Sequence, residues 1–169
     1  GVDDLVVCGA EPLFLTDYIA TGSVDPVRMA SIVEGISTGC EQAGCALVGG
    51  ETAEHPGLME PDEYDLAAAG TGIVDAPDAL SPERVVTGDV LVAMRSSGLH
   101  SNGYSLARRV LMPDASALEE VVPELTRSVG EELLEPTRIY ARDCLALIES
   151  ADVHAFSHIT GGGIAANVA

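Results

Sequence analysis

The segment between Asp25 and Gly44 constrains the fold more than any other, because it carries the signals for both ends of a helix. Asp25 is a residue type that caps helix N-termini, and the proline after it suits the first turn. Gly44 is a natural C-terminal stop. Between them, apolar residues recur at helical spacing and would share one face: Met29, Ile32, Val33, Ile36, Cys40 and Ala43. The sequence therefore predicts a helix over residues 26–43 with one buried face.

Strand-like runs flank this helix on both sides. Residues 13–19 mix apolar and polar side chains, and residues 45–48 are typical of a short buried strand. Residues 64–74 predict a third strand, rich in Ala and Gly. Such small side chains would let another layer, or another subunit, approach closely. These elements indicate an N-terminal α+β subdomain.

The second half also alternates strand and helix signals, after a connection rich in Pro and Asp over residues 75–83. Its predicted elements are a fully buried strand at Val90–Met94, a helix at 104–111, a helix from Pro136 and a strand at 153–159. The helix from Pro136 would carry Tyr140, Cys144, Leu147 and Ile148 on one face. We therefore expect an α+β or mixed α/β chain in two subdomains, residues 1–82 and residues 83–169.

The charge limits the partners of this chain. It carries 27 acidic residues against eight arginines, has no lysine, and has a formal net charge of −19. Such a surface repels nucleic acids and anionic membranes, and no apolar run approaches the roughly 18 residues that span a bilayer. A salt-adapted or arginine-rich proteome is the simplest source of this charge. Any phosphate site must therefore use Arg, backbone N–H groups or Mg²⁺, and a P-loop lysine is excluded within this stretch.

Two glycine-rich segments could bind a ligand. In residues 49–52, Gly49 and Gly50 would let the backbone approach closely, and Glu51 could bind Mg²⁺ beside them. A tight turn with Glu51 in solvent is the alternative. Residues 160–163, Thr-Gly-Gly-Gly, lead into a predicted helix whose N-terminus would attract an anion. An ordinary helix start capped by Thr160 is the alternative there.

Other polar residues carry weaker signals. The loop of residues 96–103 gathers hydroxyls, an amide and an imidazole after the predicted strand, which favours either binding or a solvated turn. Asp3 and Asp4 could bind a metal, although neighbouring acids in an acidic chain are usually solvated. His154 and His158 would share one strand face, where packing and hydrogen bonding are favoured over metal binding. The four cysteines are interpreted as reduced, mostly buried residues.

Taken together, five segments resemble the AIR synthetase family, the phosphoribosylformylglycinamidine cyclo-ligases. They occur in the family's order and at similar spacings: residues 4–14 (DLVVCGAEPLF), 47–57 (LVGGETAEHPG), 96–106 (SSGLHSNGYSL), 136–140 (PTRIY) and 158–163 (HITGGG). The resemblance covers nearly all of the chain except residues 113–130. Asp3 departs from it mildly, because many relatives carry Asn there.

The resemblance implies an N-terminal α+β domain that pairs with its twin in a homodimer, and a C-terminal α/β domain. Residues 1–82 would be the later part of the first domain, and residues 83–169 the earlier part of the second. ATP, Mg²⁺ and substrate would meet in the cleft between the domains of a cytoplasmic enzyme. The chain would then be an internal fragment that lacks part of the ATP site and does not turn over alone.

The implied reaction is the ATP-dependent closure of formylglycinamidine ribonucleotide to aminoimidazole ribonucleotide, with release of ADP and phosphate. The residues that match the family's motifs receive roles by that resemblance. The catalytic candidates are His100 and Glu51. The metal candidates are Asp4, Glu51 and Asp65. The candidates for binding ATP, substrate or their phosphates are Gly49, Gly50, Thr52, Ser101, Asn102, Arg138, Thr160, Gly161, Gly162 and Gly163.

Two alternatives stay open. One is a sister enzyme of the same ATP-binding fold, either formylglycinamidine ribonucleotide synthetase or selenophosphate synthetase. The other is a non-catalytic dimerisation module, against which the polar loops argue.

Overall fold

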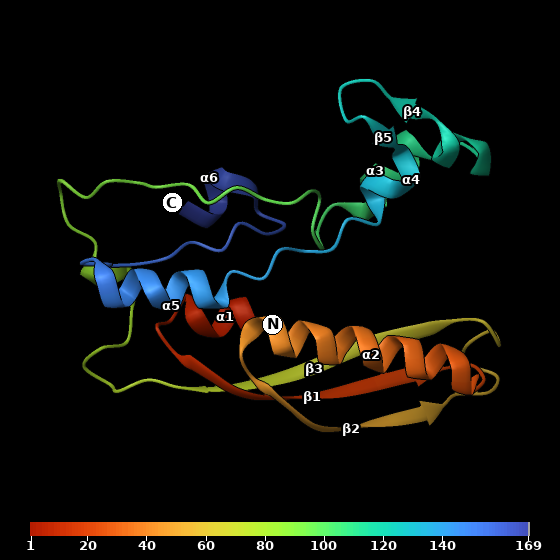
Figure 1. The fold of residues 1–169 in the computed structure, drawn as a ribbon, viewed down its shortest axis with the longest axis horizontal. Helices are drawn as coiled ribbons and strands as arrows, with labels where there is room; N and C mark the ends of the chain where they lie inside the picture. Colours follow the sequence, from red (N-terminus) through yellow and green to blue (C-terminus); the bar gives the residue numbers. More distant parts are fainter. Residues whose placement is uncertain (169) are drawn as a thin grey trace. The chain divides into compact units, whose positions relative to one another are not determined.

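The computed structural model describes residues 1–168 as two compact units (Figure 1). The first unit comprises residues 1–86 and 139–158, and the second comprises residues 87–138 and 159–168. The class is mixed α and β, as predicted. Residues 139–158 return to the first unit, so the units are not consecutive halves of the chain. The predicted family-domain division at residue 82 stays a prediction.

The first unit is built on a three-stranded sheet of order β2-β1-β3. The central strand is β1 (Glu11–Thr21), which pairs in parallel with β2 (Ala46–Glu54) and antiparallel with β3 (Tyr64–Ile73). The predicted first and third strands are confirmed. The second was predicted too short, because β2 continues beyond residue 48 through residues 49–54.

Helix α2 (Pro26–Ala43) has the predicted ends. The Asp25 carboxylate accepts hydrogen bonds from the backbone N–H groups of Val27 and Arg28, at 2.9 and 3.3 Å. Gly44 adopts a left-handed φ of 81°, and its N–H donates to the Cys40 carbonyl at 2.9 Å. The predicted buried face is only partly correct: Met29, Cys40 and Ala43 are buried, whereas Val33 is 39% exposed.

The sheet of the first unit has one covered and one exposed face. Helices α1 (Val2–Val6) and α2 contact the sheet, and α5 (Ala141–Ser150) packs on α1 (Figure 1). Leu15 and Ile19 of β1 are buried on the covered face. Because strand side chains alternate, Phe14 and Tyr18 point to the opposite face, where they are 36% and 38% exposed.

Helices α1, α2 and α5 share a small core. Its buried members are Val6, Ala43, Ala141 and Cys144. The predicted helix from Pro136 is confirmed in type, but it begins five residues later, at Ala141. Of the residues predicted to share one face, Leu147 is 38% exposed, whereas Cys144 is buried. A short 3-10 helix, η1 (Pro82–Arg84), completes the first unit.

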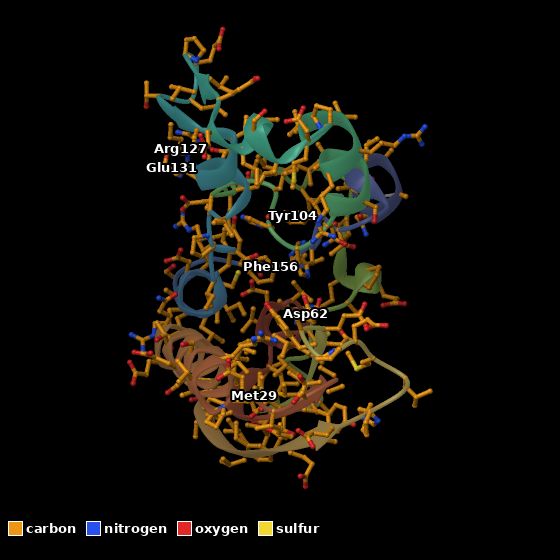
Figure 2. All side chains as sticks on the ribbon, turned by 90° about the vertical axis from the view of Figure 1, so that its right-hand side faces the viewer. Met29, Asp62, Tyr104, Arg127, Glu131 and Phe156 are labelled. Atoms are coloured by element: carbon orange, nitrogen blue, oxygen red, sulfur yellow. The ribbon has the colours of Figure 1, made fainter. Side chains whose placement is uncertain are left out.

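The second unit contains short elements around a small core of Ala107, Val129 and Leu133. Helix α3 (Tyr104–Leu111) confirms the prediction for residues 104–111. The other elements are η2 (Ala115–Glu119), β4 (Val121–Val122), β5 (Arg127–Ser128), α4 (Val129–Leu133) and α6 (Gly163–Val168). Ser128 and Glu131 form a capping box at the start of α4, and Arg127 forms ion pairs with Glu132 and Glu135 (Figure 2).

Two strand predictions are wrong. Residues Val90–Met94 form no strand, and Val90, Leu91 and Val92 are 83%, 85% and 83% exposed. Residues 153–159 are also irregular. A strand needs the backbone of a neighbour, and within residues 1–168 neither segment has a paired strand. No helix in the same range is both long and apolar enough to cross a membrane.

Candidate functional site

The Gly-Gly-Glu-Thr motif of residues 49–52 lies inside β2, not in a turn after it. Gly49 has a φ of 150° and lies at a register shift in the β1–β2 pairing. Gly50 is paired with Asp17, whose carboxylate would collide with any side chain at that position. The sheet itself therefore accounts for both glycines. Their predicted role in ligand binding, like that of Thr52, stays a prediction.

The predicted metal ligands are spread over the first unit. Glu51 is paired with Tyr18 of β1, and Asp65 is paired with Ala20, so both acids share the exposed face. They lie on the two outer strands, which are roughly 10 Å apart across the sheet. Asp4 belongs to α1, on the covered face.

These three carboxylates therefore do not fit a shared metal site in one copy of the chain. Consistent with this, residues 1–168 contain no group of three or more His, Cys, Asp or Glu side chains placed to hold a metal.

Asp4 does have a structured polar neighbour in His158. Its Oδ1 lies 2.7 Å from Nδ1 of His158, and this hydrogen bond holds the pKa of the Asp4 carboxyl below its ordinary value. His154 lies beside a different carboxylate, with its Nε2 3.5 Å from Oδ2 of Asp152. The favoured interpretation as a hydrogen-bonding residue is therefore confirmed for His158, although neither histidine lies in a strand.

Asp3 has a structural role that the sequence did not indicate. Its Oδ1 accepts a hydrogen bond from the backbone N–H of Tyr140 at 3.0 Å. Tyr140 is the residue before α5, so a carboxylate of α1 lies at the positive end of that helix. Asp3 thus connects α1 to α5 within the first unit. The signal in the sequence was its position beside Asp4, which carries no pairing information.

In the second unit, the loop of residues 96–103 is tied to residues 136–138. The Ser97 hydroxyl donates to the Pro136 carbonyl at 2.8 Å and accepts from the Arg138 N–H at 3.0 Å. The hydroxyls of Ser101 and Thr137 lie 3.3 Å apart. The structure therefore brings Ser101 and Arg138, two predicted site residues from distant segments, to one place. Ser97 and Thr137 are members of this place that the sequence prediction omitted.

His100 occupies the middle of that loop in an unusual conformation. Its φ is 58°, a left-handed value that is uncommon outside glycine, and its Nε2 accepts the Ser97 N–H at 3.0 Å. Backbone strain of this kind often accompanies a functional role. Directly after the loop, the Tyr104 hydroxyl donates to the Leu133 carbonyl at 2.7 Å, which connects α3 to α4.

The turn of residues 160–163 leads into α6, as predicted. A methyl group on Gly161 would lie 3.8 Å from Oδ1 of Asn102, so the turn and the 96–103 loop are close together in the second unit. The Thr160 N–H donates to Asn167 Oδ1 at 3.2 Å, and the Gly163 N–H donates to the Thr160 carbonyl at 3.0 Å. Two N–H groups of the predicted anion site thus have acceptors within the chain, and the turn's phosphate-binding role stays a prediction.

Two family models match this chain in succession. The model described as AIR synthase related protein, N-terminal domain, matches residues 1–74, and the corresponding C-terminal domain matches residues 86–169. The chain therefore belongs to the AIR synthase related proteins.

The curated relatives of this chain include phosphoribosylformylglycinamidine cyclo-ligases. Those of Bacillus cereus (strain G9842), Bacillus thuringiensis (strain Al Hakam) and Bacillus anthracis (strain CDC 684 / NRRL 3495) are each 51% identical over 168 residues. Each alignment covers 99% of this chain and 49% of the relative. The chain thus spans about half the length of these relatives.

Solved structures of the hydrogenase maturation protein HypE share the fold. One matches with a TM-score of 0.61 and 21% identity, over 94% of this chain and 45% of that protein. Another, HypE in complex with ATP, matches with a TM-score of 0.58 and 21% identity, over 91% of this chain and 42% of that protein. At this level of identity the similarity extends to the fold alone.

Proposed function

We propose that this chain is part of an ATP-dependent cyclo-ligase that closes the imidazole ring in purine biosynthesis. The observation that carries the proposal is 51% identity, over 99% of the chain, to phosphoribosylformylglycinamidine cyclo-ligases. The substrate would be formylglycinamidine ribonucleotide, and the products aminoimidazole ribonucleotide, ADP and phosphate. Because the chain spans about half of each relative, the activity is proposed for an enzyme of the relatives' full length.

The chemistry of the proposed reaction requires activation of a poor leaving group. Transfer of the γ-phosphoryl group of ATP to the formyl oxygen turns that oxygen into a phosphate ester. A nitrogen of the amidine then attacks the formyl carbon, the C–N bond forms, and inorganic phosphate departs with the oxygen. The work of the protein is to position the two substrates and to stabilise negative charge.

The second unit supplies the residues proposed for this positioning. His100, Ser101 and Asn102 would line the substrate side, and Arg138 would bind a phosphate through its guanidinium group. The turn of residues 160–163 would add backbone N–H donors beside Asn102. The bonds between loop 96–103 and residues 136–138 support this assignment, because they hold His100, Ser101 and Arg138 in one place.

ATP and Mg²⁺ are proposed as the nucleotide and its metal. The ATP complex of HypE supports ATP binding by this fold. Mg²⁺ is usually held by one or two carboxylates together with substrate phosphates, so the candidates Asp4, Glu51 and Asp65 would act separately rather than as one cluster. Glu51, proposed as both metal ligand and catalytic residue, lies on the exposed face of the first sheet.

That exposed face is also the surface proposed for a homodimer. Phe14 and Tyr18 lie on it beside Ala67 and Ala69 of β3, and side chains this small permit close approach of a second sheet. A twin packed there would cover Glu51 and Asp65. Sedimentation of the wild type and of a Tyr18→Asp variant tests the proposal: the variant should be monomeric, and an unchanged dimer would place the interface elsewhere. We further propose a cytoplasmic enzyme without nucleic acid or membrane partners, in line with the net charge of −19.

The experiment is an assay for aminoimidazole ribonucleotide with an enzyme of the relatives' full length that carries these residues. We expect product that requires both formylglycinamidine ribonucleotide and ATP. Glu51→Gln should reduce the yield of product. Glu119→Gln is the control and should not, because Glu119 lies at the end of η2 and outside the proposed site. A folded, ATP-binding enzyme that forms no product would favour a sister enzyme of the same fold. The same preparation should then receive the substrates of formylglycinamidine ribonucleotide synthetase and selenophosphate synthetase. A folded protein that binds no nucleotide would favour a dimerisation module.

A further inference from the structure

Ser97 makes three hydrogen bonds that join two segments of the second unit. Its hydroxyl donates to the Pro136 carbonyl at 2.8 Å and accepts from the Arg138 N–H at 3.0 Å. Its own N–H donates to Nε2 of His100 at 3.0 Å. One residue thus contacts the backbone on both sides of Thr137 and the ring of a proposed catalytic residue.

The two hydroxyl bonds replace a strand pairing. Residues 136–140 are irregular, and a strand partner would normally satisfy their backbone groups. The Ser97 hydroxyl fills this role for the Pro136 carbonyl and the Arg138 N–H. The Ser101–Thr137 contact adds a second connection between the same two segments. The backbone from which the Arg138 side chain extends is therefore fixed by the 96–103 loop.

The hydrogen bond to His100 also determines which nitrogen of its neutral ring carries the proton. A backbone N–H can only donate, so Nε2 of His100 must be the unprotonated nitrogen. The proton of the neutral ring is then on Nδ1. Because Nε2 accepts the hydrogen bond from Ser97, any proton that His100 donates must come from Nδ1. His100 has a left-handed backbone with φ 58°, and its ring turns back toward Ser97 in this conformation.

We propose that Ser97 is a positioning residue that holds Arg138 and His100 in one frame and keeps His100 as the Nδ1–H tautomer. Its consequence for the reaction rests on the proposed function: His100 does not act as a base through Nε2, because that nitrogen accepts the Ser97 N–H. Ser97 acts through these two residues and contacts neither ATP nor the nucleotide substrate.

The tautomer is tested first, in the unmodified enzyme and without turnover. Nitrogen-15 NMR of histidine-labelled enzyme should show a protonated Nδ1 and an unprotonated Nε2 for His100, with the resonances assigned through a His100→Gln variant. A proton on Nε2 would overturn the tautomer assignment whether or not the enzyme is a cyclo-ligase.

The positioning role of Ser97 is tested with Ser97→Ala and Ser97→Thr. Ser105→Ala in α3 is the matched control. Loss of two hydrogen bonds should speed amide exchange at Arg138 about tenfold and raise the KM for the phosphorylated substrate about tenfold, with a smaller fall in kcat. Ser97→Thr keeps the hydroxyl and should restore both values to within about twofold. Ser105→Ala should change neither.

A folded Ser97→Ala variant with wild-type amide exchange at Arg138 and wild-type KM would contradict the positioning role of Ser97. If Ser97→Ala does not fold, Ser97→Thr is compared with the wild type alone. A folded Ser97→Thr variant with about tenfold faster exchange at Arg138 and about tenfold higher KM would contradict the role of the hydroxyl, because threonine keeps that group. Faster exchange at Arg138 in Ser97→Ala, in an enzyme whose wild type has no cyclo-ligase activity, would support the positioning role of Ser97 and reject the proposed function.

Discussion

Two apolar runs that both predicted strands behave differently in this chain. In the first unit, residues 45–48 lead into β2, which follows the capped helix α2 and pairs with β1. In the second unit, residues 90–94 are continuously apolar but irregular, and Leu91 is 85% exposed. The helix and its strand find their partners within residues 1–54, whereas residues 90–94 pair with nothing among residues 1–168. An apolar run therefore predicts the tendency to form a strand, and the partner decides the outcome.

The largest expected effect compares one buried and one exposed apolar residue of these two regions. Ile19 of β1 is 0% exposed, so Ile19→Ala should reduce the free energy of unfolding by about 3 kcal/mol, through lost burial and a cavity. Leu91→Ala should change it by less than about 0.5 kcal/mol. Urea denaturation of both variants measures the difference. A comparable loss in Leu91→Ala would show that residues 90–94 are buried, and the contrast between the units would disappear.

The next prediction concerns the close approach inside the first sheet. Gly50→Val should destabilise the protein by about 2 kcal/mol, because its side chain meets the Asp17 carboxylate across the β1–β2 pair. Gly35 of α2 is the matched control, since a side chain there meets open space. Gly35→Ala should stabilise by about 0.5–1 kcal/mol through helix propensity. Thermal unfolding checks both, and a neutral Gly50→Val would leave ligand binding as the better reason for that glycine.

A third prediction compares the caps of the two units. Asp25→Ala should reduce the free energy of unfolding by about 1 kcal/mol, because it removes the acceptor of two N–H groups at the start of a long helix. Asp114 caps only the short η2 through Ser116, so Asp114→Ala should reduce the free energy of unfolding by clearly less. Equal losses by chemical denaturation would mean that helix length does not set the value of these caps.

The smallest effect is a pH dependence at Asp4. The His158 ring lowers the pKa of the folded carboxyl below its ordinary value of 3.8, so the ionised form favours the folded state. That contribution is present above the ordinary value and is lost as the pH falls through the folded pKa. The difference in unfolding free energy between wild type and Asp4→Asn should therefore shrink between pH 5 and pH 3, roughly the range around these values. A difference that stays constant on acidification would contradict this pairing.

The sequence predicted best those features that are settled by neighbours in the chain. Both ends of α2 and the whole of α3 follow from local signals, and β1 and β3 follow from their patterns. The extension of β2 through Gly49 and Gly50 was missed, because glycines in a sequence indicate a turn and the close approach of Asp17 is visible only in three dimensions.

For the candidate site, the motifs indicated two segments that the structure brings together, but not the hydrogen bonds that connect them. His100, Ser101 and Arg138 were identified by the family resemblance, and the structure places them together. Ser97 and Asp3 were missed because their partners, at Pro136 to Arg138 and at Tyr140, are far away in the sequence. No pattern along one chain reports a hydrogen bond of that range.

The most direct test of the proposed cyclo-ligase follows the formyl oxygen. Formylglycinamidine ribonucleotide labelled with oxygen-18 at that position should be converted with ATP by an enzyme of the relatives' full length, and the released phosphate analysed by mass spectrometry. The proposed phosphorylation of the formyl oxygen predicts one labelled oxygen in each inorganic phosphate formed. Unlabelled phosphate, with the label released to water, would contradict activation by phosphoryl transfer and with it the central role assigned to ATP.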